Sequence, residues 1–223
     1  MPLHPGSRVR LKPTTAHHFD GDTLFDRIAR VVCELACLPR KELFESWEVA
    51  RRARRRFRGG RVVDLACGHG LVAHLMLLLD DTSERALAVD TRIQPSAHRL
   101  SEALTKAWPR LSGRVEIVQR PVQEVTLESS DVVVSAHACG ALTDVVLERA
   151  SAARARIAVL PCCHDARNCD TGSLAGWLDP SLAIDVTRAQ KLMVSGYRVH
   201  TQRIPEAVTP KNRLLLGTPN DMA

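Results

Sequence analysis

The sequence contains no apolar run of the roughly 18 residues that a membrane-spanning helix needs. Its longest apolar run, Leu71 to Leu79, stops at the acidic pair Asp80 and Asp81. The opening stretch MPLHPGSRVRLKP lacks both the apolar core and the small-residue cleavage site of a secretory signal. These absences argue against membrane and secreted proteins, and we expect a cytoplasmic protein with no membrane partner.

The sequence also lacks the cysteine pattern of a disulfide-bonded secreted domain, any internal repeat and any extended low-complexity segment. Its seven cysteines form an odd set, so we expect reduced thiols. A chain of 223 residues is long enough to bury one substantial core with a modest addition, but short for two full domains.

Positive charge is concentrated in the first part of the chain. Residues 1–61 hold 14 lysines and arginines against 7 acidic residues, whereas the remainder holds 17 against 18. Seven arginines lie in the stretch RRARRRFRGGR, Arg51 to Arg61. In helical form they point all round the axis, so we expect a polyanion partner, with Arg51 and Arg55 binding substrate. A solvated face, favoured by cations near a helix C-terminus, is the alternative.

The part of the chain before residue 59 is predicted to be an addition to the main domain. Residues 1–19 show no periodicity and are expected to form an extended arm. Apolar residues at three- and four-residue steps predict helices over residues 20–39 and 41–57. We therefore expect a basic helical extension at residues 20–58 and the main domain at residues 59–223.

The stretch RVVDLACGHG, Arg61 to Gly70, predicts a strand, a glycine turn and a helix start in that order. Glycines permit positive φ and close approach of a ligand, and the first turn of the following helix offers unpaired N–H groups. About twenty residues later the apolar run ALAV ends in Asp90, placed to accept hydrogen bonds from ribose hydroxyls. Together these features predict a site for a nucleoside cofactor.

Apolar and polar segments alternate after Gly70 in the manner of βαβ units. This alternation predicts a parallel sheet covered by helices on both faces, with its ligand at the carboxyl ends of the strands. The last two strands, residues 197–205 and 213–217, leave no room for a helix between them and must form an antiparallel pair. The predicted class is α/β, a Rossmann-like and mostly parallel sheet with a C-terminal antiparallel hairpin, plus N-terminal helices.

The glycine turn is compatible with two cofactors, a nicotinamide dinucleotide and S-adenosylmethionine. GHGLVA satisfies the dinucleotide pattern G-x-G-x-x-G/A. S-adenosylmethionine is favoured because Asp64 precedes the glycines, where it could meet the amino-acid end of a small cofactor, and because the sheet finishes in a hairpin. The residues expected to bind the cofactor are Asp64, Ala66, Cys67, Gly68, Gly70, Asp90 and His137.

Four motifs carry a resemblance to a known family. DLACGHG resembles motif I of class I S-adenosylmethionine-dependent methyltransferases, with Asp90 as their ribose-binding acid. SAHACGALTD, LPCCH and IPEAVTPKNR are similar to the methyltransferase-domain family of methyltransferase-like protein 25 and the related domain of glutathione S-transferase C-terminal domain-containing protein. More distantly, they resemble the tRNA 2′-O-methyltransferases with a Cys-Cys-His signature. The resemblance covers about residues 60–217 and implies a methyltransferase fold and S-adenosylmethionine; Ala66 departs from the general motif, which has glycine there.

Histidines and cysteines follow the fourth and fifth predicted strands. His137 or His164 could act as a general base towards a ribose hydroxyl or polarise an acceptor nitrogen, since histidine titrates near neutral pH. Cys162 and Cys163 could supply the thiolate that cytosine C5 methylation requires, or could pack as small hydrophobic side chains. These four residues are the candidate catalytic groups.

The same region also admits a metal interpretation. The residue types suit zinc, but their spacing is not that of a finger or knuckle, so no bound metal is predicted. The residues in question are His137, Cys139, Cys162, Cys163, His164 and Cys169.

The link TPKNR joins the last two strands and is dense in polar residues. Lys211, Asn212 and Arg213 could hold a phosphate or orient a base, although such a link is also an ordinary hairpin connection. The predicted function is an S-adenosylmethionine-dependent methyltransferase acting on RNA, either rRNA or tRNA, at ribose or base. A protein methyltransferase and a non-catalytic RNA-binding factor with this fold are the alternatives.

Overall fold

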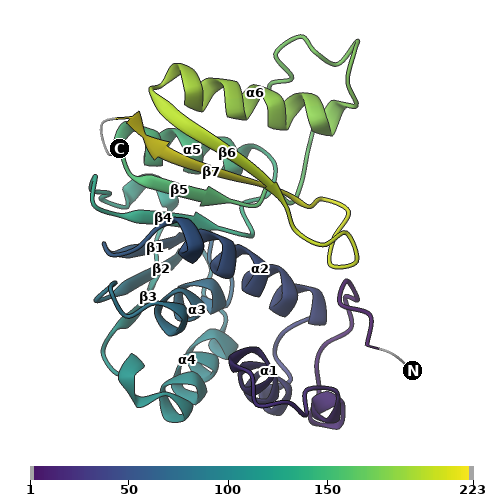
Figure 1. Ribbon diagram of the computed structural model, residues 1–223, viewed down its shortest axis with the longest axis vertical. Helices are drawn as coiled ribbons and strands as arrows, with labels where there is room; N and C mark the ends of the chain where they lie inside the picture. Colours follow the sequence, from purple (N-terminus) through teal and green to yellow (C-terminus); the bar gives the residue numbers. More distant parts are fainter. Residues whose placement is uncertain (1–2, 221–223) are drawn as a thin grey trace.

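A single mixed sheet forms the centre of the computed structural model, which describes residues 3–220 (Figure 1). Its strands are β1 (Val62–Leu65), β2 (Ala86–Asp90), β3 (Val115–Gln119), β4 (Val132–Ser135), β5 (Arg156–Val159), β6 (Tyr197–Arg203) and β7 (Arg213–Pro219). The order across the seven-stranded sheet is β3-β2-β1-β4-β5-β7-β6. Strands β1 to β5 are parallel, and β7 is antiparallel to both β5 and β6.

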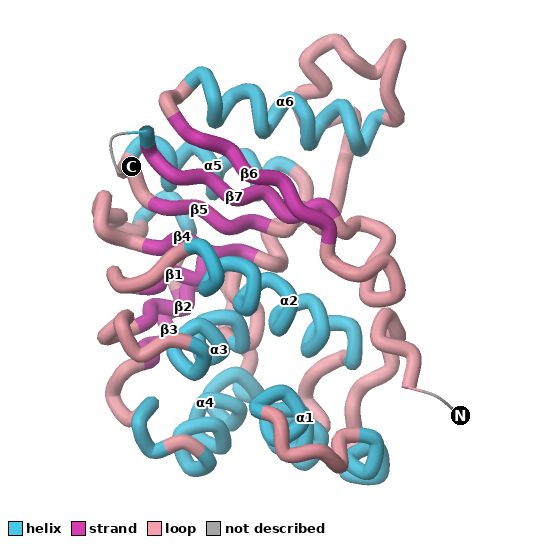
Figure 2. Tube along the Cα trace, viewed as in Figure 1, coloured by secondary structure: helices cyan, strands magenta, loops and turns pink. Residues whose placement is uncertain are grey.

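Helices cover both faces of this sheet (Figure 2). One layer contains α1 (Leu24–Leu35), α2 (Arg40–Arg56), α3 (Leu71–Leu79) and α4 (Pro95–Ala107), and the other contains α5 (Ala141–Ala152) and α6 (Pro180–Val194). Short 3-10 helices occur at Pro13–His18, Pro109–Leu111 and Val122–Glu124. Among residues 3–220, no helix has both the length and the apolar character needed to cross a membrane.

Successive strand residues supply the two cores alternately, because side chains of a strand point to opposite faces. In β1, Val62 packs with the α1–α4 layer and Val63 with the α5–α6 layer. In β4, Val132 and Val134 join the first core and Val133 the second. The central strands are buried on both faces, which explains their continuous β-branched runs.

The predicted fold class is confirmed: a mostly parallel sheet with a C-terminal antiparallel hairpin and additional N-terminal helices. After β1 the chain adds β2 and β3 on one side, and then crosses back to place β4 on the other side of β1. Open α/β sheets bind ligands at the carboxyl ends of the strands beside such a switch point. We therefore expect the ligand site at the carboxyl ends of β1, β2 and β4.

Residues 3–19 differ from the extended arm that the sequence predicts. Residues 13–18 form a 3-10 helix, and Leu11 and Phe19 are buried in the core beneath α1 and α2. The Leu11 N–H donates to the Leu38 carbonyl at 3.0 Å. Two buried apolar side chains without helical spacing give no periodic signal, so the sequence did not reveal this packing. Residues 1 and 2 of the predicted arm lie outside the described residues.

Local capping explains where the two N-terminal helices begin and end. Helix α1 begins at Leu24 rather than at residue 20, because the Thr23 side chain accepts the Asp26 N–H at 3.2 Å. It ends where Ala36 adopts a left-handed φ of 49°. Helix α2 starts after the extended Pro39 and crosses the sheet towards the amino ends of the strands (Figure 1).

Candidate active site

The turn between β1 and α3 has the backbone conformation that the glycines predict. Ala66, Gly68 and Gly70 have φ values of 56°, 57° and 71°, all in the left-handed region. A Cβ on Gly70 would lie 3.4 Å from the Ala88 Cβ, so this position leaves little room for a side chain. Alanine in a left-handed conformation is strained, and such strain is concentrated at functional sites.

Asp90 at the end of β2 lies against this turn. Its Oδ2 accepts the Gly68 N–H at 3.0 Å, and its Oδ1 accepts the Arg92 N–H at 3.1 Å. The acid is half-buried, with its carboxylate at the carboxyl edge of the sheet. The structure thus brings together the turn and the acid that the sequence places 22 residues apart.

Asp64, near the end of β1, is buried beneath the glycine turn. Its side chain is 1% exposed and accepts the Ala73 N–H at 3.2 Å, in the first turn of α3. Burial, together with the negative charges of Asp90 and Glu42, raises its pKa to about 8, while the Ala73 hydrogen bond acts in the opposite direction. The carboxyl group lies beneath the turn and supports it. Burial, and then the negative charges of Asp64 and Asp90, also raise the pKa of the neighbouring Cys67 thiol.

Glu42 is a site residue that the sequence analysis did not identify. This acid comes from α2, and its Oε1 accepts a hydrogen bond from His69 Nδ1 at 3.0 Å and lies 4.0 Å from His137 Nε2. His69 Nε2 lies 3.1 Å from Ser96 Oγ, so the ring is held at both nitrogens. Burial acts to raise the pKa of Glu42, but the His69 hydrogen bond and the charges of His137 and His69 outweigh it and lower the pKa. Glu42 is therefore a carboxylate held beside the glycine turn.

The signal for Glu42 in the sequence is weak. An acid in the first turn of a helix is common, because it complements the helix dipole. Only the packing of α2 over α3 brings Glu42 to His69, 27 residues later.

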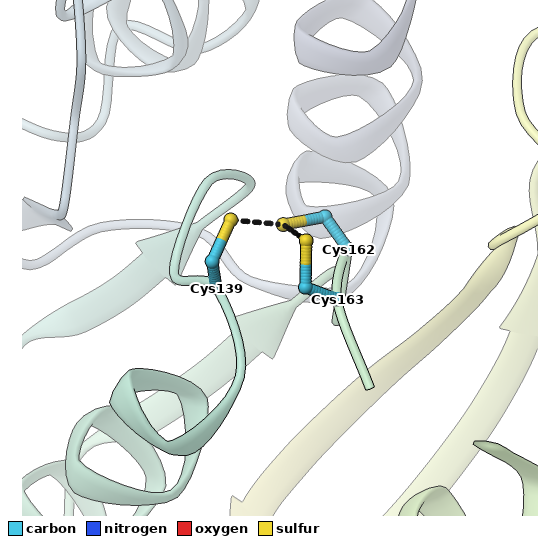
Figure 3. A group of neighbouring side chains, drawn as sticks. All are labelled: Cys139, Cys162 and Cys163. Carbon is cyan, nitrogen blue, oxygen red and sulfur yellow. Dashed lines mark hydrogen bonds between the residues drawn. The ribbon is translucent and has the colours of Figure 1, made fainter. Parts of the chain in front are cut away.

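Three cysteines gather where β4 and β5 end (Figure 3). The Sγ atoms of Cys139 and Cys162 are 3.0 Å apart, and those of Cys162 and Cys163 are 3.8 Å apart. Hydrogen bonding from Cys162 and Cys163 and the charges of His137 and Lys211 lower the pKa of Cys139, although burial opposes this effect. The hydrogen bond to Cys139 and then burial raise the pKa of Cys162.

A cleft of about 510 Å³ opens beside these groups. Its walls come from the N-terminal segment, the start of α2, the loops after β4 and β5, and the β6–β7 loop. Four of the predicted site residues line it: His137, Cys162, Cys163 and Lys211. Cys139 and Glu42 also line it, so the cleft adjoins the glycine turn through Glu42 and His137.

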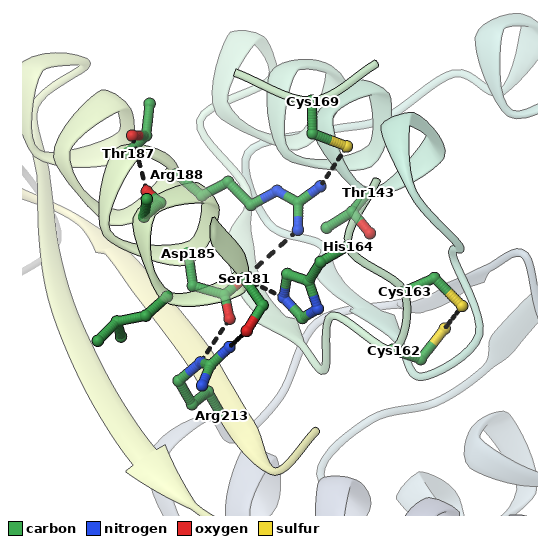
Figure 4. A network of polar contacts seen from close by, with 12 residues as sticks. Thr143, Cys162, Cys163, His164, Cys169, Ser181, Asp185, Thr187, Arg188 and Arg213 are labelled. Carbon is green, nitrogen blue, oxygen red and sulfur yellow. Dashed lines mark hydrogen bonds and ion pairs between the residues drawn. The ribbon is translucent and has the colours of Figure 1, made fainter. Parts of the chain in front are cut away.

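His164 lies in a separate polar network under α6, away from the lining of the cleft (Figure 4). Its side chain is 3% exposed, and Nε2 donates to Asp185 Oδ1 at 2.8 Å. Arg213 Nε donates to Asp185 Oδ2 at 2.6 Å, and Arg188 also pairs with Asp185. Burial acts to raise the pKa of Asp185, but His164 and Arg213 hold it below its usual range. His164 and Arg213 therefore join α6 to the strand ends.

The Asn212 side chain is also engaged in a hydrogen bond within the protein. Its Nδ2 donates to the Ile204 carbonyl at 3.1 Å, inside the connection between β6 and β7. Of the three residues predicted to bind substrate in this connection, only Lys211 lines the cleft.

The arginine-rich end of α2 lies at the opposite edge of the sheet from the glycine turn. Arg54 is 3% exposed, donates to the Met76 carbonyl at 2.8 Å and pairs with Asp80 at 3.3 Å. Arg51 pairs with Glu48 at 3.1 Å. Among the described residues, Arg55 is the only one of the seven arginines without a hydrogen bond or ion pair.

Distance along the helix separates these arginines from the cleft. Arg55 follows Glu42 by thirteen residues, which corresponds to about 20 Å of helix. Most of these arginines form hydrogen bonds or ion pairs within the protein. The arginine cluster does not lie at the cleft where we expected substrate to bind.

Comparison with known proteins agrees with this geometry. A family model described as a methyltransferase domain matches residues 46–170. No curated protein matches the chain significantly.

Solved structures show the same fold at low identity. An O-methyltransferase family protein from Burkholderia thailandensis is 17% identical, with a TM-score of 0.54 over 94% of this chain. The chain spans 63% of the length of that protein. The tRNA methyltransferase TrmK of B. subtilis is 18% identical, with a TM-score of 0.54 over 78% of this chain and 67% of its own. Cofactor-bound Rv0187 from MTB is 14% identical, with a TM-score of 0.53 over 79% of each chain.

The narrower resemblance to methyltransferase-like protein 25 and to the Cys-Cys-His enzymes stays a prediction. The family match itself covers more than half of the 223 residues and includes the glycine turn, Asp90 and all three clustered cysteines. Together with the sheet order, this match identifies the chain as a member of the methyltransferase-domain family.

Proposed function

We propose that this protein is an S-adenosylmethionine-dependent methyltransferase that acts on RNA. The observation that carries the proposal is the contact between Gly68 and Asp90 at the switch point of the sheet, with a cleft directly beside it. The turn and Asp90 would hold the cofactor, and the adjoining cleft would receive the methyl acceptor.

The residues at the turn fit this cofactor. The Asp90 carboxylate would accept hydrogen bonds from a ribose diol. A Cβ on Gly68 would lie 3.8 Å from His137 and 3.9 Å from Glu42, so the open side of the turn faces these two residues. The ionised Glu42 is suited to a cationic ligand. When bound, S-adenosylmethionine supplies an electrophilic methyl group on its sulfonium.

His137 is the residue in the cleft best placed to receive a proton from the acceptor. Its ring is partly exposed and lines the cleft. The Glu42 carboxylate at 4.0 Å would stabilise the imidazolium that forms, and His69 holds that carboxylate in place. We assign His137 the role of general base and Glu42 that of a positioning and electrostatic group.

An RNA acceptor is supported by unpaired cations at the carboxyl edge of the sheet. The exposed side chains of Arg8, Arg92, Arg120 and Lys211 lie there, and none has an ion pair within residues 3–220. Such cations contact phosphates and position a nucleic acid without reading its sequence. TrmK acts on tRNA by its name, but its likeness to this chain concerns the fold alone.

Calorimetry tests the cofactor. We expect heat of binding with S-adenosylmethionine and none with NAD, and at least tenfold weaker binding for Asp90→Ala. The matched control is Asp81→Ala, which removes an exposed acid after the far end of α3. Tighter binding of NAD, or equal binding by Asp90→Ala, would overturn the cofactor assignment.

Methyl transfer to cell extracts tests the acceptor. Purified protein with labelled S-adenosylmethionine is incubated with total RNA and, separately, with total protein. Label in RNA, lost in Asp90→Ala, supports the proposal, whereas label confined to protein identifies a protein methyltransferase. RNA binding without transfer, unchanged in Asp90→Ala, identifies a non-catalytic RNA-binding factor.

A further inference from the structure

The six cysteines and histidines that the sequence places near the last parallel strands separate into different groups in the structure. His164 and Cys169 contact Asp185 and Arg188 under α6. His137 faces Glu42. The cysteines that remain together are Cys139, Cys162 and Cys163, whose three Sγ atoms all lie within 4.8 Å of one another.

The spacing of these sulfur atoms agrees with a shared metal ion. Tetrahedral zinc with Zn–S bonds of about 2.3 Å places its thiolate sulfurs about 3.8 Å apart. Cys162 and Cys163 are separated by 3.8 Å, and Cys139 lies 3.0 Å from Cys162. The separation of the Cys139 and Cys163 sulfur atoms is within 4.8 Å, and Cys139 is an exposed residue.

The backbone holds the three thiols in this arrangement. Cys139 follows β4, and Cys162 and Cys163 follow β5, its hydrogen-bonded parallel neighbour. The Gly140 N–H donates to the Cys163 carbonyl at 3.2 Å and links the two loops directly. The three ligand atoms are thus assembled before any ion binds, which lowers the ordering cost of binding.

We propose that Cys139, Cys162 and Cys163 bind one zinc ion at the wall of the acceptor cleft. Three thiolates suit zinc, a soft to borderline cation, better than magnesium or calcium, which prefer oxygen ligands. All three residues line the cleft, so water or an acceptor atom in the cleft could supply the fourth ligand. This site is independent of the proposed function, because it requires neither S-adenosylmethionine nor RNA.

Metal analysis of the full chain tests the site. The protein is purified under reducing conditions, stripped with a chelator, reloaded with zinc and desalted before elemental analysis. We expect about one zinc per chain, and a thiolate-to-metal charge-transfer band when cobalt replaces zinc. Each of Cys139→Ser, Cys162→Ser and Cys163→Ser should weaken zinc binding by more than the roughly 10–100-fold that loss of an outer partner costs.

The matched control is Cys169→Ser, which removes a buried thiol from the neighbouring network and should retain the metal. Circular dichroism checks that all four variants are folded, and a folded cluster variant without zinc supports the site. Two results would overturn the proposal: no zinc in the reloaded protein, or zinc retained by all cluster variants.

Discussion

The two ends of α2 carry charge for different purposes. At its first turn, a single acid, Glu42, reaches two histidines beside the glycine turn. At its last turns, Arg54 is buried against Asp80, and Arg51 pairs with the buried Glu48 of the same helix. The Glu42 carboxylate thus contributes to the candidate site, whereas the dense arginine cluster mostly stabilises the packing of α2 on its neighbours.

This difference shows that charge density alone is a poor guide to a binding surface. The arginine run suggests nucleic acid because so many cations on one helix look impossible to pair. Its partners, however, include acids of α2 itself and acids at the ends of other elements: Glu48 within the helix, Asp80 after α3 and Asp131 before β4. Helix α2 thus has a structural end and a functional end, and each can be tested separately.

Removal of Arg54 should have the largest effect. Arg54→Ala leaves Asp80 with only the exposed Arg58 as an ion-pair partner and opens the interface between α2 and α3. We expect a loss of about 3 kcal/mol in the free energy of unfolding, and a Tm lower by about 6–12 °C. Calorimetric melting measures it, with Arg55→Ala as the control that stays within about 0.5 kcal/mol. Equal melting of the two variants would remove the distinction between buried and exposed arginines.

Removal of the charge on Glu42 tests the functional end. Glu42→Gln keeps the size of the side chain but no longer stabilises a protonated His137. We expect kcat to fall roughly 10- to 100-fold. Glu45→Gln, one helical turn further on and paired with Lys41 at 3.1 Å, is the control. If the two variants lose activity equally, Glu42 has no special role.

The buried Asp64 predicts how the stability of the protein depends on pH. Because burial raises its folded pKa to about 8, the folded state keeps a proton that the unfolded state loses above about pH 4. The resulting penalty is absent below pH 4, grows as the pH rises and is complete above about pH 8. We expect wild type to lose roughly 2 kcal/mol relative to Asp64→Asn between pH 5 and pH 6.5.

Urea unfolding at several pH values measures this effect. Asparagine keeps an acceptor for the Ala73 N–H, so the variant isolates the ionisation. The Glu42→Gln background should reduce the difference, because the Glu42 charge contributes to the raised pKa of Asp64. Parallel stability curves for wild type and Asp64→Asn would contradict the raised pKa.

The smallest expected effect concerns the place where RNA binds. If RNA lies across the carboxyl edge, Lys211→Ala should weaken binding roughly 3- to 5-fold and lower the salt slope by about 1. Arg55→Ala, at the other end of α2, should change neither. Filter binding at several salt concentrations measures both. The reverse result, with Arg55 dominant, would restore the arginine cluster as the RNA-binding surface.

The fold was predictable because its signals are local. Alternating apolar segments determine where strands and helices form, and the absence of a helix between residues 203 and 213 requires the final hairpin. The turn from Ala66 to Gly70 is likewise a local matter of backbone conformation, and Asp90 follows at the end of the next strand. Periodicity and turn chemistry are properties of neighbouring residues, so the sequence alone expresses them.

The candidate site was predictable only in part, because the partners of a polar side chain depend on packing. LPCCH reads as one motif, yet Cys162 and Cys163 line the cleft, whereas His164 turns to Asp185, 21 residues later. Lys211 and Arg213 separate in the same way. Neighbours in a loop can point in opposite directions, and spacing does not encode which direction each takes.

The sequence by itself thus determined the sheet, its hairpin, the glycine turn and the acid beside it. The tertiary structure decided that Glu42 enters the site, that six of the seven arginines have partners, and that three thiols share one corner of the cleft. The physical reason is the distance along the chain over which each feature is determined. Backbone conformation and amphipathic periodicity depend on residues within a few positions of one another. The pairing of charges and thiols is set by elements that meet only when the chain has packed, as with Arg61 and Asp131, 70 residues apart.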